Sequence, residues 1–178
     1  MKLDDYRNEF EQSSNRSVSM PIAGTIIWSV MALLSTQIDQ AIAVYVLLFA
    51  TGGIFPLALM ISKLRKERLV ASTNPLAKLK GLGVLMVNLL WAVHIPLLLN
   101  APEFVPMTLG IGLGLHWVVY SWIVQHPVGV IHAVLRTLMI VAVWYIFPNH
   151  GLLAISCAVV FVYLVSIYQM LTREINSF

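Results

Sequence analysis

Six long runs of apolar residues constrain this sequence more than any other feature. Each run holds about 20 residues, the length that a helix needs to cross the roughly 30 Å hydrocarbon core of a membrane. A spanning β-strand would instead alternate apolar and polar residues over about 10 positions, whereas these runs are continuous. The sequence therefore predicts an all-α integral membrane protein, a six-transmembrane-helix bundle with spans at Met20–Ile38, Ala41–Ser62, Gly81–Leu99, Val105–Val124, Val128–Phe147 and Leu152–Leu171.

The composition argues against a water-soluble domain. Hydrophobic residues make up 59% of the chain and charged residues 11%, whereas a soluble domain carries about 25% charged residues. The net charge of +3 does not point to nucleic acid, because ten of the eleven Lys and Arg residues lie outside the apolar runs, where they act as topology signals. The lipid bilayer is the expected partner.

Those ten basic residues all lie on one side of the six-span arrangement. They occur in the N-terminal segment, the connection after the second span and the C-terminal tail, and the opposite connections contain none. Because Lys and Arg favour cytoplasmic loops, both termini are predicted to be cytoplasmic. This divides the chain into a cytoplasmic segment at 1–19, a transmembrane domain at 20–171 and a cytoplasmic tail at 172–178.

Two cytoplasmic segments have a second interpretation. Leu3, Tyr6 and Phe10 are spaced for a short amphipathic turn on the inner leaflet, and a disordered tail is the alternative. The basic cluster after the second span could dock anionic phospholipid headgroups or serve only as a topology signal. That cluster comprises Lys63, Arg65, Lys66 and Arg68.

Polar residues inside the spans are the candidate ligand site, because such residues are costly in lipid and usually functional. From the 1.5 Å helical rise, Asn88, His116, Arg136 and Tyr163 lie about 10–12 Å from the cytoplasmic ends of their spans. His132 lies one turn from Arg136 on the same helix face. The first four residues therefore share one depth near the middle of the predicted membrane, and His132 lies one turn closer to the cytoplasm; the five together are called the polar layer.

Arg136 is the most informative member of this layer. Its guanidinium remains charged, and no acidic residue lies at its depth. A guanidinium binds carboxylate or phosphate through two parallel hydrogen bonds, so one interpretation is an anion site in a water-filled cavity. The other is structural: the side chain reaches the inner headgroups or bonds backbone carbonyls.

No metal, cofactor or catalytic site is predicted. His94, His116 and His132 lie at different depths, which separates them too widely for a shared metal ion. The sequence also lacks the HExxH, CxxC, GxSxG and Walker patterns.

Glycine and proline mark two other features. Gly52, Gly53 and Pro56 predict a kink in the second span, which could act as a hinge or serve packing alone. Gly110 with Gly114, and Gly129 with Ala133, have the four-residue spacing typical of close helix contacts. A homo-oligomer could add walls to a cavity, but the sequence does not establish one.

Part of the chain resembles a family of small multi-pass bacterial membrane proteins of unknown function. The resemblance rests on Phe49–Leu57 (FATGGIFPL), Ile61–Leu64 (ISKL) and Asn74–Leu76 (NPL). It implies an inner-membrane location and carries over no activity, substrate or site residue.

Three functions are compatible with these patterns. The leading hypothesis is a small transporter or channel-like protein for a polar or anionic solute, since Arg136 lacks an acidic partner. The alternative is a non-transporting accessory, sensor or partner subunit that acts through its helix faces. An intramembrane enzyme acting on lipid is a third hypothesis, and no catalytic pattern supports it.

Overall fold

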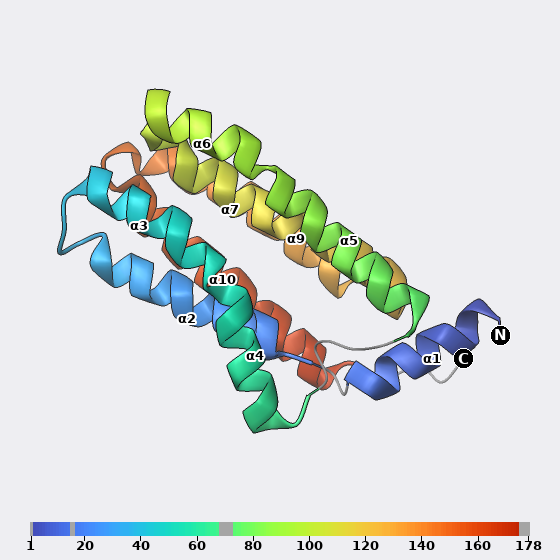
Figure 1. The fold of residues 1–178 in the computed structure, drawn as a ribbon. Coiled ribbons are helices and arrows are strands. Elements are labelled where there is room, and N and C mark those ends of the chain that lie inside the picture. The colour runs from blue at the N-terminus through green and yellow to red at the C-terminus, as the bar shows by residue number, and fades with distance from the viewer. Residues whose placement is uncertain (1, 15–16, 68–72, 175–178) are drawn as a thin grey trace.

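The computed structural model describes residues 2–14, 17–67 and 73–174, and the regular structure in these ranges is entirely helical. The long helices run along one axis as an elongated bundle, with α1 lying at one end (Figure 1). In chain order the elements are α1 Leu3–Ser14, α2 Ser19–Leu34, α3 Gln40–Gly52, α4 Ile54–Arg65, α5 Pro75–Leu89, α6 Trp91–Asn100, η1 Pro102–Phe104, α7 Val105–Leu115, α8 Trp117–Val124, α9 Val128–Ile146, η2 Pro148–His150 and α10 Gly151–Thr172.

Between four and six helical segments qualify as membrane spans. Pro75–Asn100, Pro102–Val124, Val128–Ile146 and Pro148–Thr172 are each long and apolar enough to cross a membrane alone. Two bent pairs, α1 with α2 and α3 with α4, make six if each pair is one span. The fold is thus all-helical, and its apolar helices are compatible with a membrane location.

Two helix ends lie four or more residues from the predicted span boundaries. Helix α2 ends at Leu34 instead of Ile38, and the hydroxyls of Ser35 and Thr36 bond back to carbonyls of the last turn. Helix α5 begins at Pro75 instead of Gly81 because Asn74 caps it by accepting a hydrogen bond from the Leu76 amide. The earlier start places Lys78 and Lys80 on a helix rather than in a connection.

The second predicted span is broken at its glycine pair. Helices α3 and α4 meet at Gly53 with a bend of 45°. Pro56, the third residue of α4, has no amide hydrogen to donate to the carbonyl of Gly52. Asp39 caps the other end of α3 by accepting hydrogen bonds from the Ala41 and Ile42 amides.

Helix α10 forms the centre of the bundle. It packs along α2 and α9 and also contacts α7. Small residues allow these approaches: a Cβ on Gly24 of α2 would lie 2.5 Å from the Tyr163 ring of α10. A glycine also lets α8 and α9 approach each other, because a Cβ on Gly129 of α9 would lie 1.9 Å from the Trp117 carbonyl oxygen of α8. The α5–α6 segment, by contrast, lies at the periphery and has the smallest buried share of the four long segments.

Helix α1 is not a disordered tail. It packs against α5 and α8, and its Phe10 side chain is buried. The carboxylate of Glu11 pairs with Arg173, just beyond the end of α10. The N-terminal helix and the end of α10 therefore lie at the same end of the bundle.

Candidate functional site

The Arg136 side chain lies at the centre of the bundle and is completely buried. Its Nε donates a hydrogen bond of 2.6 Å to the Gly110 carbonyl oxygen on α7. Its guanidinium carbon lies 5.0 Å from the Tyr163 ring centroid and 5.6 Å from that of Trp28. Arg136 of α9 thus contacts α2, α7 and α10 at once, through one carbonyl and two aromatic faces.

His132 adds a second polar group beside Arg136. Its Nδ1 lies 2.7 Å from the Ser166 hydroxyl, and that hydroxyl donates its hydrogen to the Val162 carbonyl. A Ser166 hydroxyl that donates to Val162 accepts from His132, which corresponds to the imidazole tautomer with its proton on Nδ1. Nε2 is left as an acceptor facing Nη1 of Arg136 at 3.5 Å. The Trp117 ring of α8 stacks on the imidazole with centroids 4.0 Å apart.

Glycines on α7 make room for this arrangement. A Cβ on Gly114 would lie 2.9 Å from Cδ of Arg136, and one on Gly110 would lie 2.9 Å from Ile140. The arginine chain therefore passes directly across the surface of α7. The four-residue spacing of these glycines is used for close packing around the charged residue.

The cluster contains polar groups without a partner. Nη2 of Arg136 and Nε1 of Trp28 are buried and make no hydrogen bond within the described chain. Such groups are uncommon in folded proteins and call for an explanation. In the described residues no Asp or Glu forms an ion pair with Arg136 either. The site therefore offers a cation and free hydrogen-bonding capacity.

The structure brings together three of the five residues predicted for the polar layer: Arg136, His132 and Tyr163. His116 lies at the break between α7 and α8, with its ring centroid 6.2 Å from that of Trp117 and its Nδ1 unpartnered. Asn88 is exposed on the outer surface of α5. A shared depth did not place Asn88 in the interior, because its helical face points away from the bundle.

The basic cluster after α4 is only partly free. Lys63 and Lys66 are exposed, whereas Arg65 donates a 2.5 Å hydrogen bond to Glu67. Arg68 lies outside the described residues. Burial alone would raise the pKa of Glu67, but hydrogen bonds from Ser19, Arg65 and Ser17 hold it below the ordinary 4.5. Glu67 thereby links the start of α2 to the end of α4.

The predicted kink residues lie apart from the Arg136 cluster. Gly52 and Pro56 are exposed on the α3–α4 pair, and no side chain approaches the Cβ position of Gly52. Their contribution is to the shape of the chain and not to the lining of the site.

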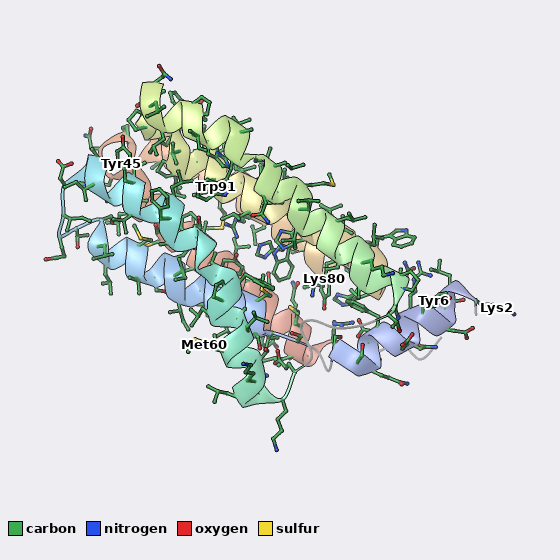
Figure 2. The ribbon with its side chains drawn as sticks, viewed as in Figure 1. Lys2, Tyr6, Tyr45, Met60, Lys80 and Trp91 are labelled. Atoms are coloured by element: carbon green, nitrogen blue, oxygen red, sulfur yellow. The ribbon has the colours of Figure 1, made fainter. Side chains whose placement is uncertain are left out.

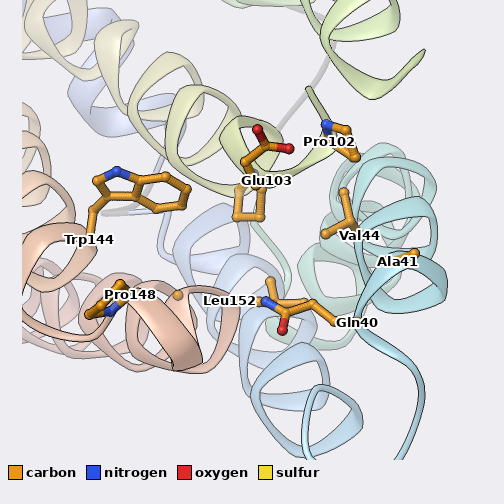
Figure 3. Close-up of a pocket in the computed structure, with 10 residues that line it drawn as sticks. Gln40, Ala41, Val44, Pro102, Glu103, Trp144, Pro148 and Leu152 are labelled. Atoms are coloured by element: carbon orange, nitrogen blue, oxygen red, sulfur yellow. The ribbon is translucent and has the colours of Figure 1, made fainter. Parts of the chain in front are cut away.

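Two hollows on the surface of the described residues contain no residue of the predicted polar layer. One, of about 190 Å³, lies among the connections at the far end from α1 and is bordered by Gln40, Glu103 and Trp144 (Figure 3). The other, of about 510 Å³, is an apolar groove between α9 and α10 that includes the exposed Cys157. Within the described residues, no three His, Cys, Asp or Glu side chains are grouped to hold a metal ion.

Several residues of the site were not singled out from the sequence. Trp28, Trp117 and Ser166 look like ordinary residues of apolar spans. Ser166 lies three positions after Tyr163, so helical spacing could have placed the two on one face. The tryptophans had no comparable signal, because their role depends on which helices are neighbours.

The whole-chain comparison identifies the family. The model of the family of unknown function DUF7010 matches residues 3–173. The chain belongs to this family. No curated protein and no solved structure matches it.

Proposed function

We propose that this DUF7010 protein binds a small anionic solute at Arg136 and carries it across the bacterial inner membrane as a transporter or channel-like protein. One observation carries the proposal: a completely buried guanidinium has no acidic partner among the described residues and one free nitrogen. In an apolar interior an anion would supply the missing charge and accept a charge-assisted hydrogen bond from that nitrogen.

The proposal includes six spans with both termini cytoplasmic. It is supported by the arrangement of charges, because α1, Lys80 and Arg173 lie at one end of the bundle. Asp39 and Glu103, which lie in connections of the opposite end, have no basic residue beside them in the sequence. Exposed Lys63 and Lys66 at the first end would contact anionic lipid headgroups. The bend at Gly53 is the proposed hinge of the α3–α4 pair.

The test separates a binding arginine from a structural one. Arg136→Met removes the charge but keeps much of the volume. It loses a charge-assisted hydrogen bond of about 1.5–3 kcal/mol and aromatic contacts of about 0.5–2 kcal/mol. It also removes a cation that costs about 2.5–3.5 kcal/mol at the centre of a membrane. These terms nearly cancel, so the variant should fold with nearly unchanged stability.

The measurement is thermal unfolding of the purified protein with a panel of small carboxylates, phosphate and sulfate. A true ligand at 100 times its Kd stabilises the protein by about 2.7 kcal/mol. The shift should vanish in Arg136→Met and remain in Lys63→Met, which removes an exposed charge. A shift that persists in Arg136→Met rejects the site. No shift in any protein, with Arg136→Met strongly destabilised, supports the accessory or subunit alternative, and copurification would then seek its partner.

Flux is tested separately in vesicles loaded with the anion that gives the shift. Protein-dependent uptake that Arg136→Met abolishes supports transport. Binding without uptake would instead support a sensor that uses the same site.

A further inference from the structure

A second group of buried charges lies at the end of the bundle covered by α1. The carboxylate of Glu11 accepts hydrogen bonds of 2.8 and 2.6 Å from one nitrogen, Nη2, of Arg173. Both side chains are almost completely buried. Nε of Arg173 is buried and unpartnered, so its guanidinium is not fully used by the pair.

The Lys80 side chain of α5 points into the bundle (Figure 2). Its ammonium lies 5.8 Å from the Phe10 ring centroid and 5.4 Å from that of Tyr120. Among the described residues Lys80 makes no ion pair, although the charge of Glu11 acts on it through space. One carboxylate thus interacts with two cations, directly with Arg173 and through space with Lys80, and Phe10 of α1 lies against Lys80.

Basic residues continue from Lys80 toward Arg136. His116 lies near enough to Lys80 and to Arg136 for both charges to act on it. The Cβ position of Gly83, one turn along α5 from Lys80, lies 3.6 Å from Cβ of His116. Lys80 at the α1 end, His116 and Arg136 at the centre are therefore neighbouring basic groups.

We infer that Arg173 and Lys80 form an anion access site, in which the carboxylate of Glu11 occupies the place of an arriving anion. The ligand class is a small carboxylate or phosphate group. This inference rests on the proposed function, because it supplies the route by which an anion reaches Arg136. An anion that replaces Glu11 on Arg173 frees α1 and uncovers Lys80.

Other contacts of α1 also hold it against the bundle. The Asn74 amide donates to the Tyr6 carbonyl at 2.7 Å and to Glu9 at 3.1 Å. The Arg7 guanidinium lies 5.0 Å from the Trp122 ring centroid of α8. Glu11 supplies the one buried ion pair among these contacts, and removal of one partner from such a pair strongly weakens the association.

The experiment measures how fast a reagent reaches the covered route. In a Cys157→Ser background, Gly83→Cys places a thiol next to His116, and its Cβ fits at an ordinary contact distance. A small anionic methanethiosulfonate reagent is added to the full chain in nanodiscs of neutral lipid. Glu11→Gln should raise the modification rate at least about tenfold, since the uncharged amide holds Arg173 far less strongly.

Two controls keep this result specific. Asp5→Asn removes a carboxylate from the same helix, where its side chain accepts a hydrogen bond from the Lys2 amide, and it should leave the rate unchanged. Glu11→Arg combined with Arg173→Glu should restore the slow rate, which guards against an unfolded single variant. Equal rates in the parent and Glu11→Gln, with Glu11→Gln still folded by thermal unfolding, would overturn the inference.

The same modification rates, measured with added anions, identify the natural occupant of the site. Inorganic phosphate should speed modification in the parent protein and have no further effect in Glu11→Gln. Acceleration in nanodiscs that contain phosphatidylglycerol, and not with phosphate, would assign the site to a lipid headgroup. Acceleration by neither would reject the access site. None of these readouts depends on Arg136 binding, so a failure here is separate from the absence of an anion-induced thermal shift.

Discussion

Gly129→Ala offers the sharpest test of how the α8–α9 contact builds the site. The methyl group would lie 1.9 Å from the Trp117 carbonyl oxygen and 2.8 Å from its carbon. Both are backbone atoms, so no side chain can rotate away, and the two helices must separate. The indole of the same Trp117 stacks on His132, so the change would also disturb the surroundings of Arg136.

The expected magnitude follows from two opposing terms. Alanine is favoured over glycine in a helix by about 1 kcal/mol. Overpacking a tight interior costs about 1–3 kcal/mol and occasionally more, and a backbone clash belongs at the upper end of that range. The net destabilisation should be about 2 kcal/mol, which lowers the unfolding temperature of a chain this long by about 4–8 °C.

The assay is thermal unfolding in detergent beside a matched control. Gly81→Ala makes the same change on α5, where nothing lies within 4 Å of the new methyl group. It should leave stability unchanged or raise it by up to about 1 kcal/mol. If Gly129→Ala is as stable as Gly81→Ala, the close α8–α9 contact is wrong.

Three further predictions address the pH response, the periphery and a helix cap. Glu67 has a pKa below the ordinary 4.5 in the folded protein. Its ionised form therefore stabilises the fold above pH 4.5, and that stability is lost as the pH falls through the folded-state pKa. Glu67→Gln should flatten the profile of unfolding temperature against pH in this acidic range. Asn88→Leu should change stability by no more than about 0.5 kcal/mol and preserve any anion-induced shift in unfolding temperature, whereas loss of the shift would place Asn88 in the site. Asp39→Ala should destabilise by about 1 kcal/mol through the lost cap of α3, and Asp39→Asn, as a control, should keep most of the stability.

Much of the fold was accessible from local patterns. Continuous apolar runs near 20 residues predicted helices and no strands, and the described residues agree. The glycine pair at 52–53 marks the position where α3 and α4 separate. The helix boundaries were less accessible from hydrophobicity. The cap at Asn74 and the bonds of Ser35 and Thr36 to their own helix set two of these boundaries.

The site was accessible only in part. Depth along each helix identified Arg136, His132 and Tyr163, because helical rise converts sequence position into height. Rotation about each helix axis was not fixed in the same way, so Asn88 was grouped with them although it faces outward. Lys80 and Arg173 served only as topology signals and Glu11 had no predicted role, since nothing local predicts that α1 packs over the end of α10.

The sequence by itself determined the apolar helices, the charge asymmetry and the lack of an acidic residue at the depth of Arg136. These are properties of one segment at a time, governed by hydrophobicity and the regular rise of a helix. Tertiary structure alone decided that Trp28, Trp117 and the Gly110 carbonyl surround the arginine and its histidine. It did so because the order and rotation of helices in a bundle depend on how small and large side chains fit across all the helices together.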